Sequence, residues 1–188
     1  QNSYPFEEYA ESRFSETKPE PQKPSSCFGC FKAKAAVKGP SFEVLARYSA
    51  TPLDSALTES ANTAGIQEDS QLLFRSLLAA AGDDEASNDH KTGLFFTPHV
   101  FFLLKHVELG VTDDEKGQAM RDEWYCQVLK QTSKNPSKKK ELRVWRLLYL
   151  VSCAFAPSND LAPYVLERCE QVMKKGARID KNSKNTSG

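Results

Sequence analysis

The chain has 188 residues, of which 39% are hydrophobic and 27% charged, and its formal net charge at pH 7 is zero. That length suits one globular domain with a substantial core, and the composition is ordinary for a soluble protein. No apolar run is long enough for a membrane-spanning helix, and no secretory signal pattern opens the chain. Because residue 1 is Gln, we expect the sequence to be a piece of a longer protein.

The five cysteines form no disulfide framework, so we expect a reducing, cytoplasmic setting. A zinc site at Cys27 and Cys30 lacks ligands, because there is no second CxxC and His90, His99 and His106 stand alone. Two other interpretations remain for these cysteines, namely palmitoylation beside neighbouring lysines and an inert loop whose phenylalanines pack on the domain. We predict neither a metal nor a cofactor.

The chain divides into four parts by composition. Residues 1–17 predict a short helix packed on the bundle, because aromatic and small side chains recur there at helical spacing: Phe6, Tyr9, Ala10 and Phe14. Residues 18–40, rich in Pro, Ser and Lys, predict a loop. Residues 41–176 predict a helical core, and residues 177–188 have almost no apolar content and predict a disordered tail.

The first half of the core predicts four helices. Short helices are expected over residues 41–48 and from residue 53 to about residue 61. A clearer one runs from about Asp69, with Asp69 or Ser70 as cap, and ends at Gly82. Pro98 suits the first turn of the next helix, which Gly110 ends.

The stretch from Met120 to Thr132, which ends before Asn135-Pro136, predicts a helix that is central in the fold rather than peripheral. Its apolar residues recur at helical spacing, which indicates a helix with one face in the core. Arg121, Asp122 and Glu123 lie inside this pattern, so they predict a structural polar core, an arginine–carboxylate network that fixes helix packing.

The last two helices follow from this point. Ser137 is the expected cap of the next one, in which apolar residues occupy two faces and predict a place in the middle of the bundle. A last amphipathic helix begins near Pro163 and ends at Gly176. No segment alternates as a strand does. The fold class is therefore all-α, a compact bundle of about six to eight helices.

The stretch MRDEWYCQVLKQTSKNP, followed by VWRLLYLVSCAFAPSNDLAPYVL, resembles the signature of the MyTH4 domain. This helical module occurs in the tails of unconventional myosins, in some plant kinesins and in some RhoGAP and PH-domain adaptor proteins. The resemblance implies a non-catalytic, cytoskeleton-associated role, with binding to microtubules or cargo peptides and an adjoining FERM domain. It also implies a structural role for the Arg121-Asp122-Glu123 motif.

The neutral total charge hides two opposite stretches. From Asp54 to Asp89 there are eight acidic residues and one basic residue, and from Lys130 to Arg146 seven basic residues and one acidic. The basic residues cluster around a helix-turn-helix and predict a partner-binding patch: Lys130, Lys134, Lys138, Lys139, Lys140 and Arg143. Such a patch suits acidic tubulin tails, a cargo peptide or an acidic membrane. A solvated, lysine-rich turn is the alternative. Nucleic acid fits poorly, since no aromatic residues alternate with the lysines.

No nucleotide-binding loop or nucleophile–base pair is present in the sequence, so we predict that this segment is not an enzyme. The favoured function is an interaction module of a cytoskeletal motor tail that binds microtubules or cargo peptides through the basic patch. The alternative is a structural or regulatory domain of a RhoGAP-type or membrane-adaptor protein. There it would only position a catalytic or lipid-binding neighbour.

Overall fold

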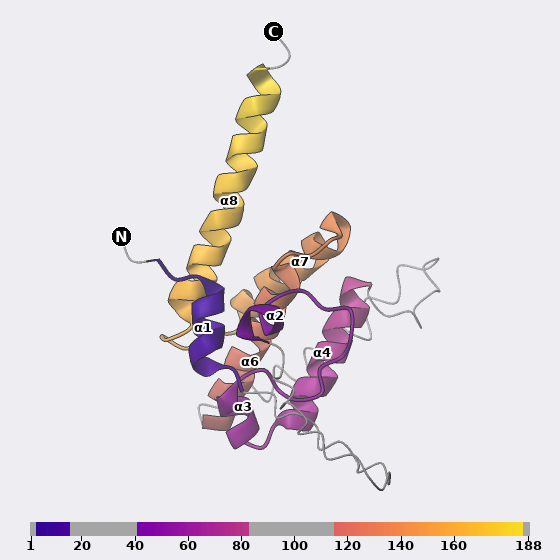
Figure 1. Cartoon of the computed structure of the whole chain (residues 1–188), viewed down its shortest axis with the longest axis vertical. Coiled ribbons are helices and arrows are strands. Elements are labelled where there is room, and N and C mark those ends of the chain that lie inside the picture. The colour runs from indigo at the N-terminus through magenta and orange to yellow at the C-terminus, as the bar shows by residue number, and fades with distance from the viewer. Residues whose placement is uncertain (1–2, 16–40, 83–114, 186–188) are drawn as a thin grey trace, which may run out of the picture.

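The computed structural model describes residues 3–15, 41–82 and 115–185, with side chains described up to residue 176. Within these ranges the chain forms helices only, apart from a single antiparallel bridge between Phe14 and Thr58. The helices are α1 (Phe6–Arg13), α2 (Phe42–Leu45), α3 (Glu59–Thr63), α4 (Gln67–Ala81), α6 (Glu115–Thr132), α7 (Lys138–Ala154) and α8 (Ala162–Asn185). The all-α prediction is therefore confirmed (Figure 1).

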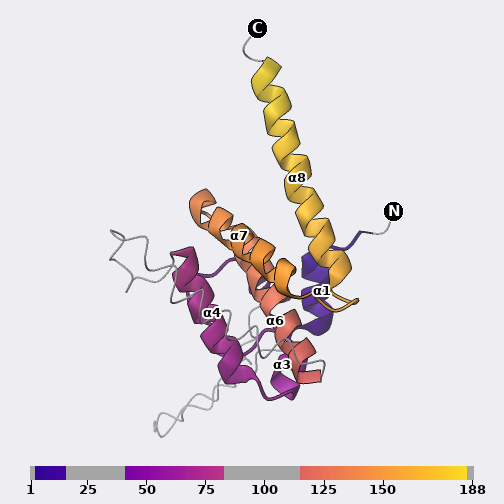
Figure 2. The ribbon, with the colours of Figure 1, turned by 180° about the vertical axis from the view of Figure 1, so that it is seen from behind.

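Helix α6 is the central element of this arrangement. It packs against α3, α4, α7 and α8, and the views from the front and from behind both place it among them (Figures 1 and 2). Every residue from Asp122 to Ser133 is buried. A helix surrounded in this way contributes side chains in all directions, so its sequence lacks the one-sided pattern of a surface helix.

Helix α4 shows one sequence prediction that holds and one that is wrong. Gly82 ends it with φ of 84°, the left-handed conformation that glycine adopts without strain. The helix begins at Gln67 rather than near Asp69, so neither Asp69 nor Ser70 is its cap. Ser70 instead lies inside the helix and is fully buried.

The segment between α2 and α3 is irregular, and the helix predicted over residues 53–61 is wrong. Helix α3 begins only at Glu59, where the Thr58 hydroxyl accepts a hydrogen bond from the Ala61 N–H at 3.3 Å. The backbone before it needs other hydrogen-bond partners because part of it is buried. A polar stripe on α6 lies against this backbone, formed by side chains that share one face of that helix: Glu123, Gln127, Lys130 and Gln131. Glu123, Lys130 and Gln131 bond to the segment itself, whereas Gln127 donates to Ser70 of α4.

Glu123 makes the densest set of contacts in this stripe. Its carboxylate is completely buried and accepts five hydrogen bonds of 2.7–2.9 Å. The donors are the backbone N–H groups of Leu57 and Thr58, the hydroxyls of Thr58 and Ser70, and the amide of Gln127. An ionised carboxylate only accepts, so these five donors match it. The contacts join α6 to α4 and to the start of α3.

Helices α7 and α8 both differ from their predictions. α7 buries Val144, Leu147, Leu148 and Val151 but exposes Leu142, Tyr149 and Leu150, so it covers the bundle with one face instead of crossing its middle. α8 does not stop at Gly176 but continues to Asn185, where the sequence predicted a disordered tail from residue 177. Its later turns project beyond the other helices in both views (Figures 1 and 2).

Helix α1 lies against α2 and the start of α8. Phe6, Tyr9, Ala10 and Phe14 are buried, and the Tyr9 ring packs edge-on against Tyr164 with centroids 5.2 Å apart. This packing fixes α1 next to α6 and the segment that connects α7 to α8.

Several predictions fall outside the described residues. These are the loop over residues 18–40, the helix expected from Pro98 to Gly110, and the interpretations of Cys27 and Cys30 and of the three histidines. In the part of the chain that the structure describes, none of the helices combines the length and the hydropathy needed to cross a bilayer.

Replacement of Glu123 by Gln is expected to lower the free energy of unfolding by about 3 kcal/mol or more. The amide that replaces one carboxylate oxygen points N–H groups at the buried donors of Leu57, Thr58 or Ser70, and those donors lose their acceptor. Urea unfolding followed by circular dichroism measures the loss. The exposed Glu68→Gln variant on α4 is the control, and equal unfolding midpoints for the two variants would contradict the role given to Glu123.

Candidate functional site

The turn between α6 and α7, together with the first turn of α7, carries four lysines, which we call the basic turn: Lys134, Lys138, Lys139 and Lys140. Lys134 has φ of 54°, so the chain reverses direction directly after α6. The Asn135 side chain holds the turn, since its amide donates to the Gln131 carbonyl at 3.0 Å and its oxygen accepts from the Ser137 N–H at 2.9 Å. Ser137 then caps α7 as predicted, accepting from the Lys140 N–H.

Most of the basic turn faces solvent. The Lys138 side chain is 89% exposed and lies 2.7 Å from the Glu141 carboxylate, and the Lys134 ammonium lies 3.8 Å from that of Glu43. Lys139 is exposed and Lys140 half-buried. Exposed ion pairs of this kind are weak, so the turn keeps a positive field.

The position of three of these lysines is unfavourable for helix stability. Lys138, Lys139 and Lys140 occupy the first turn of α7, where the helix dipole is positive and a cation costs about 0.3–1 kcal/mol. Glu141 is the only acidic residue in that turn. Helix stability alone does not favour such a cluster.

Two residues of the predicted patch do not belong to the basic turn. Lys130 is only 3% exposed, and its ammonium donates to the carbonyls of Leu45 and Arg47. Its inclusion in a binding surface is therefore wrong. Arg143 is half-buried and donates to the Ala81 carbonyl at 3.1 Å, at the C-terminus of α4, where a cation complements the helix dipole. It too serves the packing of helices.

The three residues of the predicted polar core lie in different surroundings. Glu123 receives its hydrogen bonds from backbone, hydroxyl and amide groups, so Arg121 is not the partner that satisfies it. Arg121 is half-buried and donates to the Gln118 side chain at 3.0 Å. Asp122 accepts from the Ser158 N–H at 2.8 Å and the Gln118 amide at 3.1 Å. The pKa of Asp122 is raised above its ordinary value by burial. The hydrogen bonds from Ser158 and Gln118 and the charge of Arg121 offset only part of this increase.

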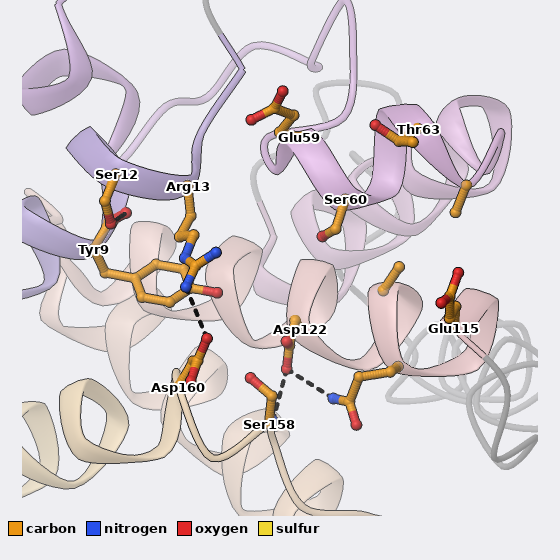
Figure 3. Close-up of a pocket in the computed structure, with 13 residues that line it drawn as sticks. Tyr9, Ser12, Arg13, Glu59, Ser60, Thr63, Glu115, Asp122, Ser158 and Asp160 are labelled. Atoms are coloured by element: carbon orange, nitrogen blue, oxygen red, sulfur yellow. Dashed lines mark hydrogen bonds and ion pairs between the residues drawn. The ribbon is translucent and has the colours of Figure 1, made fainter.

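A second surface feature lies at the other end of α6. It is a hollow of about 550 Å³ between α1, α3, α6 and the segment that connects α7 to α8 (Figure 3). Four acidic residues line it, and we call it the acidic hollow: Glu59, Glu115, Asp122 and Asp160. Arg13 also lines it and pairs with Asp160 at 2.7 Å. The hollow could not be predicted from the sequence, because its residues come from four separate segments and no spacing connects them.

Comparisons with known proteins agree with the resemblance in the sequence. The family model described as "MyTH4 domain" matches residues 111–186. Unconventional myosin-VIIb of Mus musculus is 30% identical over 134 residues, which are 71% of this chain and 6% of that protein. Unconventional myosin heavy chain 6 of Caenorhabditis elegans is 38% identical over 90 residues, 48% of this chain and 4% of that protein. The kinesin-like protein KIN-14I of Oryza sativa subsp. japonica is 38% identical over 65 residues, 35% of this chain and 5% of that protein.

Solved structures share the fold of this chain. The MyTH4-FERM MF2 domain of Dictyostelium discoideum myosin VII superposes with a TM-score of 0.62 and 21% identity, covering 96% of this chain and 32% of that one. The C-terminal MyTH4-FERM domain of human myosin 7b, solved in complex with the harmonin-a PDZ3 domain, gives a TM-score of 0.59 at 22% identity, covering 89% of this chain and 28% of that one. This chain therefore spans only a small part of the proteins that it matches.

The burial of Lys130 predicts a pH dependence of stability. Desolvation lowers its pKa from 10.5 to about 8, so between these pH values the unfolded chain binds more protons at this residue than the folded chain. The contribution of Lys130 to the free energy of unfolding should therefore rise by about 3 kcal/mol from pH 8 to pH 10.5. Urea unfolding of the wild type and of Lys130→Met across this range measures it, because other titrating groups cancel in the difference. A difference that stays constant with pH contradicts the lowered pKa.

Proposed function

Because this chain carries a MyTH4 domain, we propose that it is a non-catalytic interaction module of a cytoskeletal motor tail, which binds microtubules through the basic turn. Cargo peptides with acidic side chains are the other partners that such a surface fits. The proposal includes a cytoplasmic location on the cytoskeleton. It also includes a FERM domain next to this segment in the parent protein, as in the MyTH4-FERM structures that share its fold.

The observation that carries the proposal is the exposure of Lys134, Lys138 and Lys139 on one turn. Three consecutive lysines at the start of α7 oppose its dipole and so weaken that helix slightly. Such a cluster is better explained by an anionic partner than by stability. Acidic polymers such as tubulin tails attract a compact group of lysines over about 10 Å at moderate ionic strength, and salt screens this attraction.

The relatives support a motor tail more than an adaptor protein. They include myosins and kinesin-like proteins, and a motor tail needs a contact with cytoskeleton or cargo. In a RhoGAP-type or membrane-adaptor protein the same fold would act as a spacer, and the basic turn would have no microtubule to bind.

The proposal predicts salt-sensitive pelleting with taxol-stabilised microtubules. The variant Lys138→Glu/Lys139→Glu should reduce the bound fraction at least about tenfold at low salt, because two charges are reversed at the contact. Lys140 stays unchanged in this variant since it is half-buried. Co-sedimentation at low and near-physiological salt, over a series of microtubule concentrations, measures the change.

A matched variant separates a local effect from one of total charge. Arg75→Glu/Lys116→Glu changes the net charge by the same amount at exposed positions on α4 and at the start of α6, and it should pellet almost as the wild type does. Equal losses in both variants would mean a non-specific charge effect. No pelleting of the wild type at either salt concentration would overturn the proposal and favour the adaptor alternative.

A further inference from the structure

The acidic hollow is lined by four carboxylates and the guanidinium of Arg13, and it lies at the end of α6 opposite the basic turn. Figure 3 shows Tyr9 and Arg13 reaching toward it from α1 and Asp122 from α6, with Glu59 of α3 at its edge. Its volume of about 550 Å³ falls within the range of pockets that bind ligands. Its lining residues Glu59 and Glu115 are exposed to solvent, so a side chain of another protein can reach the hollow.

The hydroxyl of Tyr9 is a polar group that faces this hollow. Tyr9 is only 5% exposed, and its side chain points from α1 into the hollow (Figure 3). No hydrogen bond to this hydroxyl is found among the residues that the structure describes. Burial raises the pKa of Tyr9 above its ordinary value, so the group keeps its proton and can both donate and accept.

Asp122 provides a second acceptor beside Tyr9. It is 8% exposed, and the hydrogen bonds from Ser158 and Gln118 both end on its Oδ1 atom. A cationic ligand adds to the stabilisation that the hydrogen bonds from Ser158 and Gln118 and the charge of Arg121 already give to this buried carboxylate. Glu59 and Glu115 add negative charge where the hollow opens.

The arrangement suits an organic cation more than a metal ion. Within the described residues, no three His, Cys, Asp or Glu side chains come close enough together to hold a metal. A guanidinium group instead presents several N–H donors in a planar fork, which can reach acceptors that lie apart, and its charge is permanent.

We propose that the acidic hollow binds an arginine side chain from a basic segment of a protein partner, with the Tyr9 hydroxyl and the Asp122 carboxylate as acceptors. Glu59 and Glu115 attract the segment. The hollow is larger than one guanidinium group requires, so residues that flank the arginine fill the rest of it, and the Tyr9 hydroxyl can donate to a carbonyl of the bound backbone. This site is separate from the basic turn and takes ligands of the opposite charge.

The test is an NMR titration of the backbone amides with two short peptides at low salt. One is an acetylated and amidated pentapeptide of glycine and serine with arginine at its centre, and the other has citrulline, the neutral isostere, in its place. The arginine peptide should give saturable shifts around Tyr9 and Asp122, and the citrulline peptide should bind at least about tenfold more weakly because it lacks the charge. Arginine amide alone should also bind more weakly than the peptide.

Two variants keep the test independent of folding. Tyr9→Phe removes only a hydroxyl that makes no hydrogen bond to the described residues, so the thermal midpoint of this variant should stay near that of the wild type. The arginine peptide should bind to it about fivefold more weakly. The exposed Tyr149→Phe variant is its control. Glu59→Gln/Glu115→Gln should weaken binding similarly, and Glu8→Gln/Glu11→Gln, exposed on α1, should not.

Three results would overturn this assignment. They are equal binding of the arginine and citrulline peptides, unchanged affinity in Tyr9→Phe and Glu59→Gln/Glu115→Gln, and arginine amide binding as tightly as the peptide. The two proposals can fail separately. The variant Lys138→Glu/Lys139→Glu, which should lose microtubule binding, retains the acidic hollow and should bind the arginine peptide as the wild type does.

Discussion

The fold depends on how an irregular, partly buried stretch of backbone between α2 and α3 finds hydrogen-bond partners. Glu123 receives the N–H groups of Leu57 and Thr58, and Lys130 donates to the carbonyls of Leu45 and Arg47. Gln131 donates to the Ser49 carbonyl at 2.8 Å. Unpaired backbone groups in the interior are costly, so one face of the central helix has to be polar. This requirement explains why α6 combines full burial with charged side chains.

The same helix separates two surfaces of opposite charge. Glu115 and Asp122 near its start help to form the acidic hollow, and the basic turn follows its end. Glu115 in the first turn and Lys134 just after the last turn complement the dipole of α6, whereas the three lysines of the first turn of α7 oppose the dipole of α7. The polar stripe holds α6 in place. The acidic hollow and the basic turn are therefore kept at opposite ends of one rigid helix about 27 Å long. A module of this kind can contact two partners without a change of shape.

Residue spacing predicted the helical class, the central place of α6, the Ser137 cap and the end of α4 at Gly82, because these depend on local periodicity and capping chemistry. It did not predict where Lys130 lies, although Glu123, Gln127, Lys130 and Gln131 share one helix face. That polar face resembles a solvated one until the segment it binds is known. The acidic hollow was unpredictable for a related reason, since Tyr9, Glu59 and Asp160 meet only through tertiary packing. The prediction for α7 was wrong because exposed apolar residues such as Tyr149 have the spacing of a second buried face.

Hydrogen exchange of the chain alone and with saturating taxol-stabilised microtubules would locate the microtubule contact without any substitution. If the basic turn binds microtubules, backbone amides in residues 133–141, which include the basic turn, exchange more slowly in the complex, and exchange around Asp122 at the acidic hollow is unchanged. Protection confined to the region of the acidic hollow, or no protection anywhere despite pelleting, would contradict the assignment of microtubule binding to the basic turn.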